Sequence, residues 1–294
     1  MFVPRAQNPV LAACLTLLAS GFVAGTTLLA KMLGTDALGP ALHPFQISQG
    51  RFIFALLAFA TAALALRLQF TEIAWKTHTL RVFCGWGGVT LMFAAAAFIP
   101  LSDATAISFL NPVIGMLLAI PLLKERVGPV RLGAAAIALA GALILLRPTP
   151  EAFQPAALLA LGAAIALGFE IIVIKRLTGR EGPMQILLTN NVIGVGIASI
   201  AALWVWIAPT PQQWVALAGI GFLMAAAQAC FINAIARADA SFVGPFFYAT
   251  LIFAALYDFI VFGVRPDSVS TIGTLIILCG AGLLMWREGR LKAA

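Results

Sequence analysis

Three charged residues lie inside otherwise apolar stretches of the sequence, and they are the first candidates for chemistry. Arg51 directly precedes the apolar run FIFALLAF, while Glu170 and Asp258 are carboxylates in later apolar stretches. A charge at the centre of a bilayer costs about 2.5–3.5 kcal/mol on insertion scales, so such residues face partners or a cavity. Arg51 could therefore bind a substrate carboxylate, or it could join helices as a structural residue.

The positions of these charges along their stretches indicate where partners should be sought. With the orientation argued below, Arg51 and Asp258 lie at similar depth in the outer half of the membrane, and we expect them to pair or to share one polar cluster. Glu170 lies in the inner half, where it could carry a proton. A structural alternative is that Glu170 reaches the cytoplasmic edge or pairs with Lys175 or Arg176.

Prolines inside two apolar stretches predict helix breaks. Asn111 and Pro112 lie midway along one stretch, and Gly244 and Pro245 lie in the first half of another. A proline removes a backbone hydrogen bond and frees a carbonyl, so matching breaks can mark a binding site, although kinks also serve packing alone. The candidate cavity residues are Arg51, Asn111, Asn190, Asn191, Gln228 and Tyr248.

Five other polar or aromatic residues have a structural explanation. Asp103 and Asp239 each stand where an apolar stretch begins, just after a short turn, which is the position of a helix N-cap. Trp204, Trp206 and Trp214 flank one predicted turn, as expected for an aromatic belt at a membrane surface. We therefore assign neither group to ligand binding.

The elements that must position these residues are membrane-spanning helices. Of the 294 residues 62% are hydrophobic and 10% are charged, whereas a soluble domain is about half apolar and about a quarter charged. In lipid a helix satisfies its own backbone groups, and about 20 apolar residues suffice to span the bilayer. The sequence predicts an all-α membrane protein with ten transmembrane helices, at residues 10–30, 44–66, 80–99, 103–123, 129–146, 155–175, 184–207, 213–236, 240–263 and 269–286.

The Lys and Arg residues predict the orientation of the chain. Fourteen of the 18 fall on one side of the predicted membrane, whereas Lys31, Arg147 and Arg265 fall on the other and Arg51 lies inside a span. Because positively charged loops stay in the cytoplasm, both termini are predicted to be cytoplasmic. The positive charges form no basic run with interleaved aromatics, so they do not indicate nucleic-acid binding.

The two halves of the sequence resemble each other. The motif PFQI at residues 44–47 recurs as PMQI at residues 183–186, and SDAT at residues 102–105 corresponds to ADAS at residues 238–241. Five spans in each half is an odd number, so the halves must have opposite orientations in the membrane. We expect a 5+5 inverted-topology repeat, with residues 1–147 and 148–294 as the two units of one membrane domain.

The stretch NPV at residues 111–113, followed by LLKERV at 122–127 and by Gly133 and Gly141, resembles the EamA signature of the drug/metabolite transporter superfamily. The second half carries a weaker copy, FGVRP at residues 262–266, in which Val264 replaces the usual acidic residue. The resemblance covers essentially the whole chain and implies a transporter fold. Within the superfamily the chain is most similar to the YddG-type amino-acid exporters.

The repeat, the resemblance and Arg51 together predict a secondary transporter. We expect export of small metabolites, amino acids first, by alternating access; the alternative is export or import of a drug, nucleoside or cofactor. An intramembrane enzyme is a distant alternative, because the motifs GxxxxGK[ST], HExxH and GxSxG are absent. The expected partners are a small-molecule substrate and membrane lipid, with no cofactor, metal or nucleic acid, in a monomer or homodimer. Proton coupling and facilitated diffusion both remain open.

Overall fold

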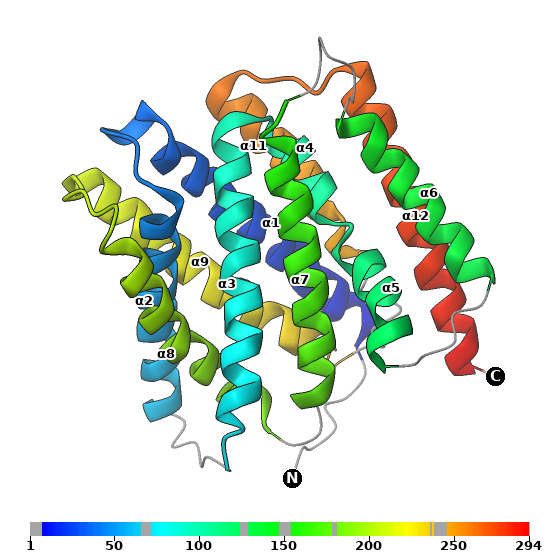
Figure 1. Cartoon of the computed structure of the whole chain (residues 1–294), viewed down its shortest axis with the longest axis horizontal. Coiled ribbons are helices and arrows are strands. Elements are labelled where there is room, and N and C mark those ends of the chain that lie inside the picture. Colours follow the sequence, from blue (N-terminus) through cyan, green and yellow to red (C-terminus); the bar gives the residue numbers. More distant parts are fainter. Residues whose placement is uncertain are drawn as a thin grey trace.

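The chain folds into a bundle of long helices (Figure 1). The computed structural model describes residues 8–65, 72–123, 129–146, 154–177, 181–235, 237 and 246–293. Within these ranges the regular structure is helical and there is no strand, which confirms the predicted all-helical architecture. Figure 1 shows α1 beginning and α12 ending towards the bottom of the view. We call this the lower end of the bundle, and the opposite end the upper end.

The helices follow the apolar stretches of the sequence closely. Their bounds are α1 Pro9–Gly34, α2 Pro44–Ala65, α3 Trp75–Phe98, α4 Leu101–Ser108, α5 Asn111–Leu123, α6 Pro129–Leu146, α7 Ala157–Leu177, α8 Pro183–Ala202, α9 Pro211–Ile235, α11 Ala249–Phe262 and α12 Ser268–Ala293, with a short 3-10 helix η1 at Asp36–Leu38. Compared with the predicted spans, α1 runs past residue 30, α3 begins before residue 80 and α8 ends before residue 207.

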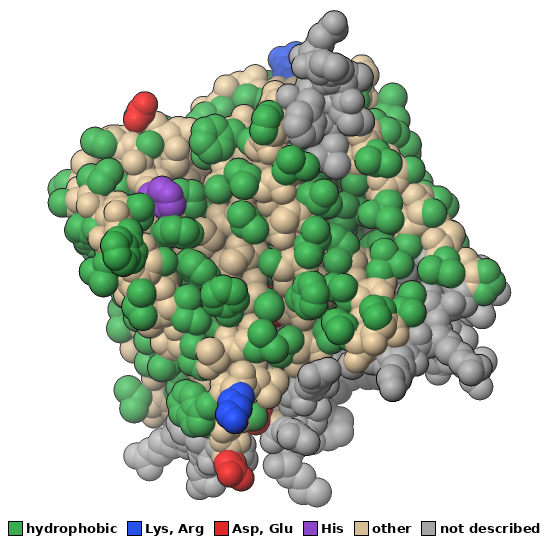
Figure 2. Space-filling view, viewed as in Figure 1, with side chains coloured by type: hydrophobic (Ala, Val, Ile, Leu, Met, Phe, Trp, Pro, Cys, Tyr) green, Lys and Arg blue, Asp and Glu red, His purple; other side chains and the backbone are tan. Residues whose placement is uncertain are grey.

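Several of these helices can cross a membrane. Among the described residues, six helical stretches are long and apolar enough, and shorter apolar stretches lie in α6, α7, α11 and α12. Figure 2 shows one face of the molecule, with hydrophobic side chains over its middle and the coloured charged side chains near its two ends. Trp204, Trp206 and Trp214 are 86%, 48% and 42% exposed, as expected for aromatic residues at a membrane surface.

The helix ends are set by familiar local chemistry. The Asn8 side chain accepts a hydrogen bond from the Leu11 N–H, and Pro9 occupies the first position of α1, where its missing N–H costs nothing. At a C-terminal end, α11 stops at Gly263, whose φ of 68° lies in the left-handed region that favours glycine.

Helix pairs pack closely through small residues. The main pairs are α6 with α12, α1 with α9, α3 with α7, α2 with α8 and with α9, α5 with α7, and α1 with α11. At Gly141 on α6, an added methyl group would lie 2.8 Å from the carbonyl oxygen of Gly273 on α12. At Gly280 on α12, it would lie 2.6 Å from the backbone nitrogen of Ala138 on α6. Inside lipid no hydrophobic effect drives helices together. Close van der Waals packing of the backbones at these glycines therefore stabilises the pair.

Candidate functional site

Two helix breaks face each other through aromatic side chains. The helical stretch that starts at Leu101 is interrupted at Phe109 and Leu110, and α11 begins after a turn at Tyr248. The Phe109 ring centroid lies 5.3 Å from that of Tyr248 and 6.0 Å from that of Phe247. Phe231 on α9 extends the group, 5.1 Å from Phe247. We call Phe109, Phe231, Phe247 and Tyr248 the aromatic cluster.

Backbone carbonyls beside the second break are bound from another helix. The Ser20 hydroxyl on α1 lies 3.3 Å from the carbonyl oxygen of Phe246 and 3.2 Å from that of Phe247, to which it can donate. A helix interruption inside a membrane protein is tolerated where neighbouring side chains satisfy the freed groups. The break is therefore a stable feature of the fold, held between α1, α9 and α11.

Of the two predicted proline breaks, only the one at Pro112 lies within the described residues. Asn111 is half-buried and begins α5, so Pro112 is the second residue of a helix and does not lie within a continuous one. A proline at this position fits the start of a helix, because the first N–H groups have no partner there. Gly244 and Pro245 lie outside the described residues.

A buried ion pair joins α1 to α11 near the upper end. Lys31 Nζ lies 2.5 Å from Asp258 Oδ1, and the two side chains are 10% and 2% exposed. The second carboxylate oxygen of Asp258 accepts a hydrogen bond of 2.8 Å from the Leu101 N–H, at the start of α4. Lys31 also lies over the Phe262 ring, 4.6 Å from its centroid. The expected pairing of Asp258 with Arg51 is wrong, because Lys31 occupies the carboxylate.

Asp103 joins helices and does not act as the cap that its position suggests. One of its carboxylate oxygens accepts a hydrogen bond of 2.8 Å from the Ser270 hydroxyl on α12. The α4 N-cap is Pro100, which makes no side-chain cap bond, so Asp258 supplies the acceptor at this helix start. Asp239, the expected counterpart, lies outside the described residues.

A second group of buried charges joins α2, α3 and α7. Arg81 on α3 forms an ion pair with Glu170 on α7, with 3.3 Å between Arg81 Nε and Glu170 Oε1. The Glu170 carboxyl group packs on Gly85, where an added methyl group would lie 2.9 Å from it. Arg51 on α2 lies within electrostatic range of Glu170 and Arg81 but forms no ion pair with Glu170. We call Arg51, Arg81 and Glu170 the charged cluster.

Lys31 and Arg81 were not among the candidate site residues predicted from the sequence. Lys31 lies in the last turns of α1 and is 8% exposed, and Arg81 lies in α3 and is 7% exposed. The helices extend beyond their most apolar stretches, so hydropathy places their ends too early. The side chains of Lys175 and Arg176, the partners expected for Glu170, lie outside the described part of the structure.

The predicted asparagines lie on α8, which packs on α2 and α3. Asn190 is 6% exposed. It stands one turn after Ile186, whose carbonyl lies 3.4 Å from Arg81 Nη1, and one turn before Gly194, which packs against the Phe52 ring. Positions four residues apart share one helix face, so Asn190 faces the same side as these two contacts.

Several buried polar atoms in this region have no hydrogen-bond partner among the described residues. They are Arg51 Nε, His78 Nδ1, Arg81 Nε, Thr90 Oγ1, Asn191 Oδ1 and Gln228 Oε1, on α2, α3, α8 and α9. Of these, Arg81 Nε still has an ion-pair contact, 3.3 Å from Glu170 Oε1. The Asn191 amide nitrogen, by contrast, donates to the Leu187 carbonyl. Buried polar atoms are normally bonded, so a group without partners marks an interior that can accept a solute or water.

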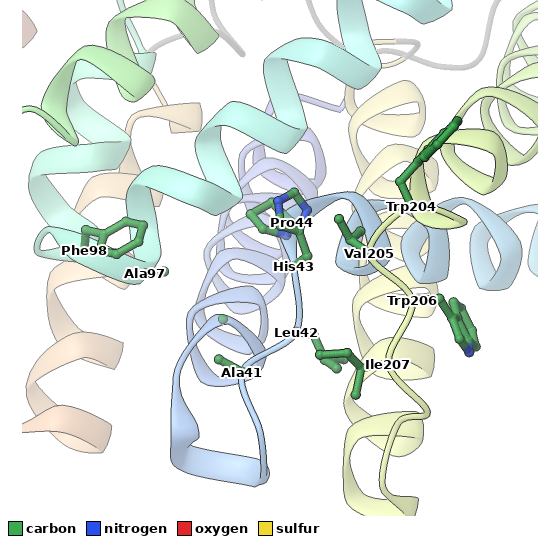
Figure 3. A pocket seen from close by; sticks show the side chains of 11 residues that line it. Ala41, Leu42, His43, Pro44, Ala97, Phe98, Trp204, Val205, Trp206 and Ile207 are labelled. Carbon is green, nitrogen blue, oxygen red and sulfur yellow. The ribbon is translucent and has the colours of Figure 1, made fainter.

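A groove opens at the upper end of the bundle (Figure 3). It measures about 610 Å³ and lies between the segment before α2, the end of α3 and the segment after α8. Its lining includes His43, Phe98, Trp204, Trp206 and Ile207. The groove is mainly apolar and aromatic, which suits a flat solute.

A carboxylate ties two helix starts together at the lower end. Glu181 accepts hydrogen bonds from the Ala74 N–H (3.1 Å), the His78 imidazole (2.9 Å) and the Gln185 amide (2.8 Å). Burial would raise the pKa of the Glu181 carboxyl, but these bonds outweigh it and hold the pKa below its ordinary value. The carboxylate therefore fixes α3 to α8 in its ionised form.

The described residues offer no metal site. None of their His, Cys, Asp and Glu side chains gather in a group of three or more with suitable geometry. Cys14, Cys84, Cys230 and Cys279 are free thiols. The polar chemistry of the described interior comes from the buried charged residues, the amides and the hydroxyls.

The fold and these buried charges define a multi-pass helical membrane protein. The EamA-like transporter family matches residues 10–147 and again residues 154–286. The chain belongs to the EamA-like transporter family, within the drug/metabolite superfamily. Together with bacterial relatives, this places it in the inner membrane as a transporter of small metabolites.

Three of the relatives are named as transporters of riboflavin or of S-adenosylmethionine. A riboflavin transporter of Vibrio cholerae is 31% identical, over 77% of this chain and 76% of its own length. A riboflavin transporter of Rhizobium johnstonii is 33% identical, over 77% and 75%. An S-adenosylmethionine uptake transporter of Rickettsia prowazekii is 24% identical, over 85% and 86%. None of these three is an amino-acid exporter of the YddG type.

A solved structure shares the fold. It superposes with a TM-score of 0.65 at 19% identity, and the match covers 95% of this chain and 99% of the other. At this identity the likeness concerns the arrangement of helices alone.

Proposed function

We propose that this protein is a secondary transporter of a planar heterocyclic metabolite of the size of a cofactor. The observation that carries the proposal is the aromatic cluster, in which Phe109 and Tyr248 meet at two facing helix breaks. Flat rings stack on such side chains with a gain of about 0.5–1.5 kcal/mol per pair. Riboflavin and S-adenosylmethionine, named for the relatives, each contain a flat heterocycle, and the aromatic groove at the upper end suits the same chemistry.

The proposed mechanism is alternating access between two inverted halves of five helices each. Exchanging the halves converts the pair α1–α9 into α7–α3, α2–α9 into α8–α3, and α1–α11 into α7–α5, and all of these pairs are packed in the structure. The pairs α2–α8 and α6–α12 convert into themselves. This near-symmetric packing and the twofold family match support an inverted repeat with its site at the repeat interface.

The solute crosses without chemical change, and both chain termini face the cytoplasm. The excess of Lys and Arg on that side supports the orientation. The lower end is then the cytoplasmic end, with the tie at Glu181, and the upper end carries the Lys31–Asp258 pair and the groove. We propose that the hydrogen bonds of Glu181 and the Lys31–Asp258 ion pair break alternately as the two halves move relative to each other.

Amino-acid export is the second candidate. The observation in its favour is the charged cluster, where arginine and glutamate side chains could bind the carboxylate and the ammonium group of a zwitterion. We favour a planar solute over an amino acid as the substrate, because the aromatic side chains gather at the helix breaks themselves.

The test is a panel of labelled solutes in liposomes containing the purified protein, with and without a pH gradient. Riboflavin, S-adenosylmethionine and several amino acids form the panel. Flux of a planar heterocycle, weakened several-fold by Phe109→Ala, supports the proposal. The control is Phe83→Ala, because Phe83 is 59% exposed and lies on α3, a helix that carries no residue of the cluster. Flux of amino acids alone, or an equal loss in both variants, would contradict it.

A further inference from the structure

The charged cluster holds more positive than negative charge inside the membrane region. It contains two guanidinium groups, Arg51 and Arg81, and one carboxylate, Glu170. Arg51 and Arg81 are 5% and 7% exposed, so water screens neither of them well. An uncompensated charge in such a place costs several kcal/mol, which is why buried charges are normally paired.

Glu170 is committed to Arg81. Their ion pair measures 3.3 Å, and the Glu170 carboxyl group is wedged against Gly85, on the same face of α3 as Arg81 one turn earlier. The face of α3 therefore fixes the carboxylate beside Arg81.

Arg51 lacks such a partner. Among the described residues, no carboxylate lies within ion-pair distance of it, and its buried Nε has no hydrogen-bond partner. Its guanidinium lies over the Phe52 ring at 4.1 Å, a contact that leaves the donor edge of the group unused.

The residues beside Arg51 are ordered and small. Ser48, one turn earlier on α2, accepts a hydrogen bond of 3.1 Å from the Trp86 indole, and Ala55 is fully buried one turn later. The helix face that carries Arg51 is thus held in place by α3, while no described side chain takes up its donors. A buried guanidinium with unused donors can bind an anion that reaches it.

We propose that Arg51 binds an anionic group of the transported solute, a carboxylate or a phosphate. The inference rests on the proposed function and specifies it, because it predicts preference for a heterocycle with an oxyanion over its neutral parent. Arg81 and Glu170 act as positioning residues. Glu170 lowers the positive potential at Arg51, so that the anion binds and is also released.

The experiment compares matched solutes on the full-length protein in detergent. Riboflavin 5′-phosphate is paired with riboflavin, and S-adenosylmethionine is paired with its decarboxylated form, which differs from it only in lacking the carboxylate. We expect Arg51→Gln to weaken binding of the oxyanion-bearing member of at least one pair by about tenfold, equivalent to one charge-assisted hydrogen bond, and to spare the member that lacks the oxyanion. The pair that responds tells phosphate from carboxylate.

Two further variants distinguish a specific effect on anion binding from a folding defect. Arg51→Lys keeps the charge and should retain part of the preference, whereas Glu170→Gln should strengthen binding of the anion, the opposite sign to Arg51→Gln. Equal effects of Arg51→Gln on both members of each pair, or weaker anion binding in Glu170→Gln, would overturn the inference and leave the proposed function standing.

If the wild-type protein binds none of these heterocycles, the proposed function is wrong, but the anion site can still be tested by a second measurement. Inorganic phosphate and acetate at tens of millimolar should then raise the thermal stability of the wild type but not of Arg51→Gln, by binding the folded state alone. No difference between the two proteins would overturn the inference as well.

Discussion

The Lys31–Asp258 pair offers the sharpest test of the structure, through the substitution Asp258→Asn. The two side chains are 10% and 2% exposed, and removing one partner of a buried pair costs about 3–5 kcal/mol, because the other charge is left alone. Asparagine keeps an acceptor for the Leu101 N–H, so the start of α4 remains capped. The Phe262 ring, 4.6 Å from Lys31 Nζ, offsets part of the loss. We expect a net destabilisation of about 2–4 kcal/mol.

The free energy of unfolding can be measured by titrating SDS into mixed micelles and following tryptophan fluorescence. The matched control is Asp36→Asn, the same chemical change at an exposed residue of η1, for which we expect almost no effect. The double variant Lys31→Met with Asp258→Asn should lose less than the two single variants together, because it leaves no isolated charge.

Two results would refute this reasoning. Wild-type stability in Asp258→Asn would mean that the pair contributes nothing to the fold. Additive effects in the double variant would mean that Lys31 and Asp258 act independently, which is incompatible with a direct ion pair.

Two further predictions concern the lower half of the bundle. Gly85→Ala should displace the Glu170 carboxyl from Arg81 and lower stability by about 1–3 kcal/mol in the same unfolding assay. The control is Gly87→Ala, which should leave stability unchanged because nothing lies within 4 Å of its added methyl group. Equal effects of the two substitutions would argue against the close packing of Glu170 on Gly85. The pKa of Glu181 lies below its ordinary value of 4.5, so its stabilising contribution is present above pH 4.5 and is lost as the pH falls through the lowered value. Thermal stability should therefore fall on acidification in the wild type and change less in Glu181→Gln, and parallel pH profiles would contradict this.

The fold was accessible from sequence because membranes constrain chains strongly. A run of apolar residues long enough to span lipid has to be helical, so the stretch 44–66 predicts α2 almost to the residue. The ends of other helices were less accessible. α1 continues to Gly34 and carries Lys31, whose buried charge has a carboxylate partner, and hydropathy contains no information on that partner.

The site was predictable only in part. Arg51, Asn190 and Asn191 are buried, as their positions in apolar stretches indicate. The partners were not predictable, because pairing depends on which helix lies beside which. Asp258 and Arg51 were expected to meet on grounds of depth alone, whereas the packing of α1 on α11 brings Lys31 to Asp258 instead.

The sequence by itself determined that this chain lies in a membrane, that it is helical, and that Arg51, Glu170 and Asp258 need partners or a solute. Composition and hydropathy act locally, residue by residue, and so they can be read along the chain. The tertiary structure decided which charges form ion pairs, that Phe109 meets Tyr248 across two helix breaks, and that Arg51 has no carboxylate within ion-pair distance among the described residues. These properties depend on contacts between residues far apart in sequence, which exist only once the helices have packed.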